Sequence, residues 1–79
     1  MEKKRVGIIG AGAWGTGLGQ ALARGGNEVQ LWALEDEVES SINKEHENKK
    51  FLPGFPLSQN VTCTTNIIEA ATDKDFISM

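Results

Sequence analysis

The sequence predicts an α/β domain with a doubly wound parallel sheet, of which these 79 residues are expected to form the N-terminal half. Short apolar segments alternate with segments of helical periodicity, in the order β-α-β-α-β-α-β. A cluster of glycines directly follows the first apolar segment. Strands that alternate with helices pair in parallel through right-handed crossovers, and a chain of this length holds one small domain at most.

The first half of the chain contains two predicted strands and one predicted helix. Residues 6–9 form an apolar run without alternation, which is typical of a strand buried on both faces of a parallel sheet. A helix is expected over residues 14–24, and the glycines at 25–26 end it. Its apolar stripe is predicted to consist of Trp14, Leu18 and Leu22. Residues 28–32 alternate polar and apolar side chains, which predicts the second strand.

A second helix and a long connection are expected next. The helix begins with acids, which suit a helix N-terminus, and ends near Glu45. Residues 46–60 predict a long ordered connection between this helix and the third strand. Its expected anchors are Phe51, Leu52 and Phe55. Connections of this length are uncommon unless they have a function.

The last part of the chain predicts two more strands around a short helix. Residues 61–64 predict the third strand and include Cys63, the one cysteine. Because its neighbours are apolar or β-branched, we interpret Cys63 as a plain strand residue and not as a reactive thiol. Asn66 is expected to cap the helix, with Glu69 as the reciprocal partner. The fourth strand begins at Asp75.

Composition and charge exclude several classes of function. The net charge is −3, so the chain lacks a basic field that would attract nucleic acid or an anionic membrane. No apolar run approaches the roughly 20 residues of a membrane span. The basic start at residues 1–5 precedes an apolar run too short for a signal-peptide core, so no signal peptide is expected. A single cysteine fits a reducing, cytoplasmic location.

The glycine cluster matches G-x-G-x-x-G, the phosphate-binding pattern of Rossmann-type dinucleotide-binding domains. Its residues are Gly10, Ala11, Gly12, Ala13, Trp14 and Gly15. Taken alone the pattern is weak, because a simple β–α turn without a ligand also uses glycines. Here it follows a predicted strand and opens a predicted helix inside a βαβ unit, and that context predicts a dinucleotide site.

Each glycine of the cluster has a predicted mechanical role. Gly10 permits the tight turn out of the strand, Gly12 lets a pyrophosphate approach the backbone, and Gly15 lets the helix pack close to the sheet. Amides near Ala13 and Trp14 then point at the phosphates, and the helix dipole assists them.

The end of the second strand predicts which dinucleotide binds. An acid about 20 residues after the glycines usually holds the ribose hydroxyls of NAD, and Glu35 lies at that distance from Gly15. Glu35 has an equally suitable role as an acid at a helix N-terminus. With Asp36 and Glu37 it would repel a 2′-phosphate, and no Lys or Arg lies between residues 26 and 42 to bind one. The sequence therefore favours NAD over NADP.

Other candidate residues receive structural interpretations. Trp14 is expected near the ligand, whereas core packing is the default for Trp32. His46 lies among charged residues and is interpreted as a solvated loop residue and not as a catalytic group. We find no metal-ligand spacing, hydrolytic triad or nucleophile elbow, so no catalytic residue and no metal ligand is assigned in this chain.

Beyond the glycines, the sequence resembles the start of the glycerol-3-phosphate dehydrogenases. Residues 9–16, IGAGAWGT, are similar to the opening of that family, and residues 29–32, VQLW, match its second strand. The strongest match is residues 42–54, INKEHENKKFLPG, against the family's I-N-x-x-x-x-N-x-x-(Y/F)-L-P-G. Leu57 and Asn60 fit the positions that follow. A generic dinucleotide-binding domain would share only the glycines.

The resemblance implies reversible hydride transfer between NAD(P)H and dihydroxyacetone phosphate, giving sn-glycerol 3-phosphate. The partners it implies are a dinucleotide and this small phosphorylated three-carbon substrate, and a homodimer is one hypothesis for the assembly. Ala13 and Trp14 would lie beside the cofactor. Leu34 stands where NADP-using bacterial members usually have Arg or His, which again favours NAD. The family's catalytic lysines and substrate domain lie beyond residue 79.

Two alternatives remain open at this point. One is a sensing module that binds NAD without chemistry, and the other is an FAD-binding domain. The segment between Asn43 and Gly54 favours the enzyme, because a sensor has no need of it. FAD-binding domains usually place a Glu at the end of the second strand, where this chain has Ala33.

Overall fold

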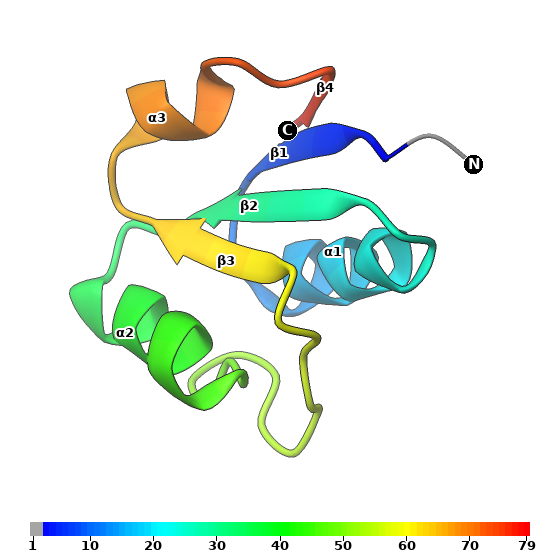
Figure 1. Ribbon diagram of the computed structural model, residues 1–79. Helices are drawn as coiled ribbons and strands as arrows, with labels where there is room; N and C mark the ends of the chain where they lie inside the picture. Colours follow the sequence, from blue (N-terminus) through cyan, green and yellow to red (C-terminus); the bar gives the residue numbers. More distant parts are fainter. Residues whose placement is uncertain (1–2) are drawn as a thin grey trace.

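A computed structural model describes residues 3–79; Met1 and Glu2, part of the basic start considered above, lie outside the described residues. The strands are β1 (Arg5–Ile9), β2 (Glu28–Trp32), β3 (Val61–Thr64) and β4 (Phe76–Ser78), and the helices are α1 (Ala13–Arg24), α2 (Asp36–Glu45) and α3 (Ile67–Ala71). Within this part of the chain the strands form one parallel sheet in the order β3-β2-β1-β4 (Figure 1). The predicted α/β order is confirmed.

The strand order reverses once, between β1 and β4. The chain moves outward from β1 through β2 to β3 and then crosses back over the sheet to the other side of β1. Because crossovers are right-handed, this reversal places α3 on the opposite face of the sheet from α1 and α2 (Figure 1). The carboxyl ends of β1 and β4 therefore form a topological switch point, where open α/β sheets bind their ligands.

Helix α1 packs on the sheet through small and polar side chains, and the predicted stripe is wrong in part. Its buried residues are Thr16, Gly19, Gln20 and Ala23. Trp14 is 76% exposed, whereas the two leucines of the stripe are partly buried against the core. A Cβ on Gly19 would lie 3.1 Å from Cδ2 of Leu31. The helix lies so close to the sheet that glycine, and not leucine, occupies the centre of the contact.

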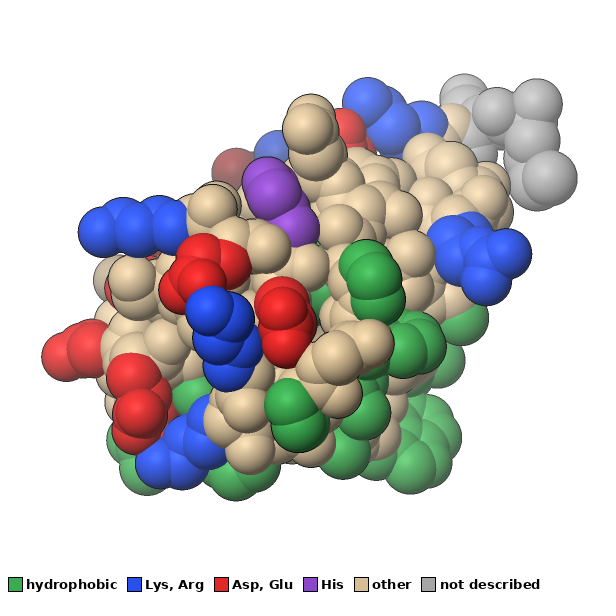
Figure 2. All heavy atoms as spheres, turned by 90° about the horizontal axis from the view of Figure 1, so that it is seen from below, with side chains coloured by type: hydrophobic (Ala, Val, Ile, Leu, Met, Phe, Trp, Pro, Cys, Tyr) green, Lys and Arg blue, Asp and Glu red, His purple; other side chains and the backbone are tan. Residues whose placement is uncertain are grey.

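The connection over residues 46–60, called the strap below, runs along α1. The amide of Gln20 makes two hydrogen bonds to Ser58, of 2.9 Å and 2.8 Å, and Asn60 Nδ2 donates to the carbonyl oxygen of Ala23 at 2.9 Å. On the face that α2 and the strap form, side chains of both charge signs are interspersed (Figure 2). Exposed pairs such as Lys49 with Glu45 contribute little to stability.

The predicted anchors of the strap are wrong, although the connection itself lies between α2 and β3, where the sequence predicted it. Phe51 is 38% and Phe55 40% exposed, and Leu52 is half-buried. The buried strap residues are Leu57, at 6% exposure, and Asn48, at 0%. The strap is therefore held mainly by amide side chains that pair with α1, because α1 presents a polar face to it.

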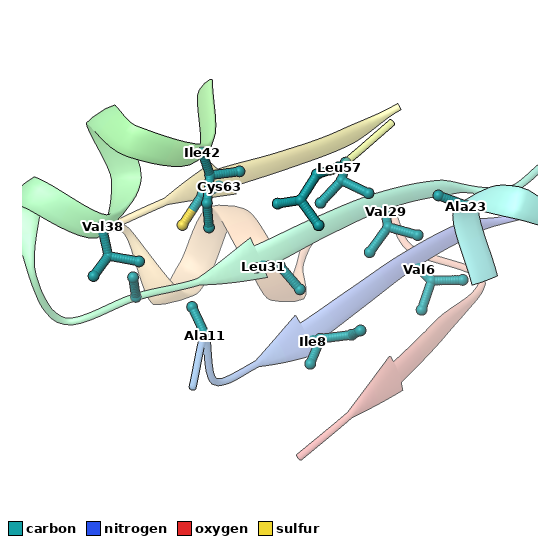
Figure 3. Packing of buried hydrophobic residues seen from close by; sticks show 12 residues of the cluster. Val6, Ile8, Ala11, Ala23, Val29, Leu31, Val38, Ile42, Leu57 and Cys63 are labelled. Atoms are coloured by element: carbon teal, nitrogen blue, oxygen red, sulfur yellow. The ribbon is translucent and has the colours of Figure 1, made fainter. Parts of the chain in front are cut away.

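The core lies between the sheet and the pair α1 and α2 (Figure 3). Leu31 of β2 and Val38 and Ile42 of α2 have no exposed surface. The alternation expected for β2 is confirmed, since its second and fourth residues are buried. Cys63 is buried in β3 at 4% exposure, as a plain strand residue would be. Among the described residues no helix is long and apolar enough to cross a membrane.

The cap of α3 is confirmed, and its reciprocal partner is not. The side-chain oxygen of Asn66 accepts hydrogen bonds from the amides of Ile68, at 3.0 Å, and Glu69, at 3.2 Å. The Glu69 carboxylate turns toward the sheet and accepts from Gln30 Nε2 at 2.7 Å. The amide of Asn66 instead donates to Thr64 Oγ1 at 3.1 Å. The predicted reciprocal bond is not made because α3 lies over β2, where the side chain of Gln30 is within reach of the Glu69 carboxylate.

Candidate dinucleotide-binding site

A cleft of about 330 Å³ lies at the carboxyl ends of β1 and β4, at the topological switch point. Five of the six residues of the glycine cluster line it, together with the ends of both strands, including Ser78 and Met79. Ala11 is the exception: it is 6% exposed and belongs to the core cluster. The structure therefore brings five of the six predicted residues to the cleft, whereas Ala11 packs into the core and does not line it.

The three glycines of the cluster meet different surroundings. Gly10 has a φ of 145°, a conformation that L side chains rarely adopt. A Cβ on Gly15 would lie 2.4 Å from the carbonyl oxygen of Gly10, so the start of α1 packs directly on the turn. A Cβ on Gly12 would meet nothing within 4 Å and would enter the open cleft. The space beside Gly12 thus fits a group that approaches the backbone closely, as a pyrophosphate does.

The N-terminus of α1 opens into the cleft without a cap. Gly12 is the N-cap residue, no side chain caps the helix, and no acid lies in its first turn. The first amides of a helix have no partner within the helix, and the helix dipole makes this end positive. An anion in the cleft would meet Ala13 and the largely exposed Trp14 at this end.

The residues that follow β2 form an acidic edge. Leu34 is 77% exposed, and Glu35 is the N-cap residue of α2, where its side chain makes no capping hydrogen bond. Three acids follow in the first turn of that helix: Asp36, Glu37 and Glu39. Glu35 therefore lies at a helix N-terminus, as its interpretation as a helix-start acid required. Its carboxylate makes no capping hydrogen bond, so it stays available for the alternative role of binding the ribose hydroxyls.

The strap brings a lysine to this acidic edge, which the sequence argument missed. Lys50 Nζ lies 2.8 Å from Glu37 Oε1, thirteen residues away in the chain. The hydrogen bond and charge of Glu37, together with the charge of Glu35, raise the pKa of Lys50. The lysine is therefore already paired with a carboxylate. The edge stays net negative, because it holds more acids than lysines.

Two other candidates lie away from the cleft. Trp32 is half-buried at the end of β2, and its Nε1 donates to the carbonyl oxygen of Thr65 at 2.9 Å. His46 is half-buried and ends α2 with a left-handed φ of 55°. Its backbone carbonyl oxygen accepts a hydrogen bond from the amide of Leu57 at 2.8 Å. The interpretation of His46 as a solvated loop residue is therefore wrong in part: it joins the helix to the strap. No cluster of potential metal ligands occurs within residues 3–79.

A larger hollow of about 490 Å³ lies beside α3, on the other side of the sheet from α1. Side chains of both charge signs line it, and several serve the fold. Lys74 Nζ donates to backbone carbonyls at the end of α3, and Glu69 is hydrogen-bonded to Gln30. Because its charges oppose one another, this hollow defines no single class of ligand.

The parallel sheet, the glycine turn and the uncapped helix at the switch point define a dinucleotide-binding domain of the Rossmann type. The sequence model of one family, described as the N-terminus of NAD-dependent glycerol-3-phosphate dehydrogenase, matches residues 5–79. This chain belongs to that family.

Individual relatives agree with this assignment. The chain is 53% identical over 74 residues to glycerol-3-phosphate dehydrogenase [NAD(P)+] 1 of Sphingopyxis alaskensis, a match that covers 94% of this chain and 22% of the relative. It is 45% identical over 74 residues to glycerol-3-phosphate dehydrogenase [NAD(P)+] of Bacillus subtilis, covering 94% of this chain and 21% of that protein. The chain thus spans about a fifth of the length of the curated relatives it matches.

Solved structures show the same arrangement of elements. The crystal structure of glycerol-3-phosphate dehydrogenase from Coxiella burnetii superposes with a TM-score of 0.85 at 31% identity, over 95% of this chain and 23% of that one. The glycerol-3-phosphate dehydrogenase of Saccharomyces cerevisiae gives a TM-score of 0.86 at 31% identity, over 96% and 25%. The predicted family resemblance and the fold are confirmed.

Proposed function

We propose that this chain binds NAD, and that the protein carrying it transfers a hydride reversibly between that cofactor and dihydroxyacetone phosphate. The observation that carries the proposal is the uncapped N-terminus of α1, which opens into the switch-point cleft beside Gly12. When bound, NADH would supply the hydride, and uptake of one proton by the ketone oxygen completes the reduction to sn-glycerol 3-phosphate. The relatives named above support this choice of substrate.

The residues of this chain have the task of holding the dinucleotide. Gly12 leaves room for the pyrophosphate, and the amides at the start of α1, near Ala13 and Trp14, would bind its oxygens. We infer that residues 1–79 form the first part of the NAD-binding domain, and that the groups which bind the substrate and move its proton lie elsewhere in the protein.

We further propose that NAD is preferred over NADP. Leu34 offers no charge to a 2′-phosphate, and the acids at the start of α2 repel one. Lys50 does not reverse this, since it is already paired with Glu37. One misplaced charge beside a phosphate makes a preference of about 1–3 kcal/mol reasonable.

The cofactor site is tested by titrating NADH into the full-length protein, monitored by fluorescence. Gly12→Val should weaken NADH binding at least about tenfold, or about 1.4 kcal/mol, because the branched side chain enters the cleft. Gly17→Val is the matched control: a Cβ there also meets nothing within 4 Å, but Gly17 does not line the cleft. Equal NADH affinity in wild type and Gly12→Val would contradict the proposed site.

The reaction is tested separately, by NADH oxidation with dihydroxyacetone phosphate. NADH binding without turnover in the full-length protein would favour the sensing module. Absorbance at about 450 nm in the purified protein would favour FAD. Either result would overturn the proposed reaction.

A further inference from the structure

A polar side chain lies fully buried beneath the glycine loop, and the function proposed so far does not use it. Asn48 comes from the strap and is 0% exposed. Polar atoms of buried side chains normally have at least one hydrogen-bond partner. Those of Asn48 are made to the loop, to α1 and to the strap itself.

The orientation of the Asn48 amide follows from its partners. Its oxygen accepts a hydrogen bond from the amide of Phe51 at 3.1 Å, and a backbone amide can only donate. The amide nitrogen therefore faces the loop, where it donates to the carbonyl oxygen of Ala11 at 2.7 Å and to Thr16 Oγ1 at 2.9 Å. Both donated bonds are between buried groups, so neither is readily replaced by water.

The bond to Ala11 sets the direction of the next amide in the loop. In a trans peptide the C=O and the following N–H point in opposite directions, and no cis peptide occurs among the described residues. With its carbonyl held by Asn48, the Ala11–Gly12 peptide directs its N–H away from Asn48. Gly12, which carries that N–H, lines the cleft.

The bond to Thr16 joins the loop to the helix behind it. Thr16 is also fully buried, and its amide donates to the carbonyl oxygen of Gly12 at 3.0 Å in the first turn of α1. One side chain thus holds the peptide before Gly12 and the turn after it. An anion site built from backbone amides gains affinity when those amides are fixed before the ligand arrives.

We propose that Asn48 is a positioning residue for the pyrophosphate of the dinucleotide, acting through the Ala11–Gly12 peptide. The inference rests on the proposed dinucleotide site and assigns it a support from outside the glycine cluster. In this role Asn48 would not contact the dinucleotide, because its side chain is fully buried. Its effect is to hold the backbone that would.

A purely structural role for Asn48 would be to fasten the strap to α1. Other residues already do that: Gln20 makes two bonds to Ser58, and Asn60 binds the carbonyl oxygen of Ala23. Gln20 is buried at 8% exposure and its bonds do not reach the glycine loop. Gln20→Ala is therefore a matched control, which removes buried bonds between strap and α1 and leaves the phosphate loop intact.

The test compares two ligands of the full-length protein: ADP-ribose, which contains the pyrophosphate, and adenosine, which has no phosphate. Asn48→Ala should weaken ADP-ribose binding about tenfold and change adenosine binding less than about twofold. Gln20→Ala should change both affinities less than about twofold, even where it lowers the melting temperature as much. Calorimetry for ADP-ribose and NMR shifts for adenosine give the two affinities.

A second pair of variants keeps the test decisive if Asn48→Ala does not fold. Thr16→Val nearly conserves volume and removes one acceptor of the Asn48 amide, so ADP-ribose binding should weaken, and Thr16→Ser should restore it. Equal losses for ADP-ribose and adenosine, or an equal loss of ADP-ribose affinity in Gln20→Ala, would overturn the role of Asn48 alone. Failure of the wild type to bind ADP-ribose would overturn the proposed dinucleotide site itself.

Discussion

Alanine at Gly15 and alanine at Gly12 should separate folding from ligand binding within one loop. At Gly15, an added Cβ would lie 2.4 Å from the carbonyl oxygen of Gly10 and 3.5 Å from Cγ2 of Ile8. Carbon and carbonyl oxygen normally approach to about 3.3–3.6 Å, so the loop or α1 must move by about 1 Å. The obstructing atom is backbone, and overpacking of this kind costs about 1–3 kcal/mol of unfolding free energy.

At Gly12 the fold should tolerate the same substitution. The backbone there has φ −76° and ψ −172°, which alanine adopts, and the Cβ would meet nothing within 4 Å. The expected cost is below about 1 kcal/mol and comes from the weaker preference of alanine for a helix N-cap. The methyl group would instead occupy the space assigned to the pyrophosphate, so NADH affinity should fall about tenfold.

Denaturant unfolding and NADH titration of the two full-length variants measure both quantities. Gly15→Ala should lose stability, and its NADH affinity should fall as the loop shifts. Gly12→Ala should keep its stability and lose NADH affinity. The reasoning is refuted if Gly15→Ala is as stable as the wild type, or if Gly12→Ala binds NADH normally.

Leu34→Arg should raise the ratio of kcat/KM for NADPH to that for NADH, and Glu37→Gln should raise it further by releasing Lys50; an unchanged ratio in both would contradict the charge argument. Burial, and secondly the charge of Glu39, raise the pKa of the Cys63 thiol to about 12, so thiol reagents at neutral pH should label it only after unfolding. Rapid labelling of the native protein would contradict the burial of Cys63. Because the pKa of the thiol in the unfolded chain is its ordinary 9.0, ionisation of Cys63 should also favour unfolding as the pH rises above that value. Residues 1–79 alone should not oxidise NADH with dihydroxyacetone phosphate. They should also have low thermal stability or self-associate, since β4 leaves apolar side chains exposed at a sheet edge. Turnover would contradict the first expectation, and a monomer with a sharp thermal transition at about 45–65 °C would contradict the second.

The elements and the position of the site could be predicted because their signals are local. An unbroken apolar run, a glycine turn and an amphipathic segment each occupy a few consecutive residues. The handedness of crossovers then leaves few ways to arrange them. For the same reason Gly10, Gly12 and Gly15 could be assigned separate roles from the sequence alone. The surroundings of each glycine agree with those roles, since one has a positive φ, one opens to the cleft and one packs on the turn.

Side-chain partners distant in sequence could not be predicted in this way. Periodicity placed Trp14 in the apolar stripe of α1, but the first turn of that helix faces the cleft, so the indole is exposed. Glu69 stands at the right spacing for a capping box, but the sheet beneath α3 offers it Gln30. Lys50 lies thirteen residues beyond Glu37, and only the path of the strap joins them.

The sequence by itself determined the fold class, the family and the loop that lines the cleft, because each depends on short patterns whose geometry is nearly independent of the rest of the chain. The tertiary structure decided what supports that loop. Phe51 and Phe55 are the largest hydrophobic residues of the strap, yet Asn48 is its most buried side chain. Hydrophobicity predicts burial only on average. A buried amide is stabilised by its particular partners. The Asn48 amide nitrogen donates to Ala11 and Thr16, and these residues come within its reach only when the strap folds back along α1.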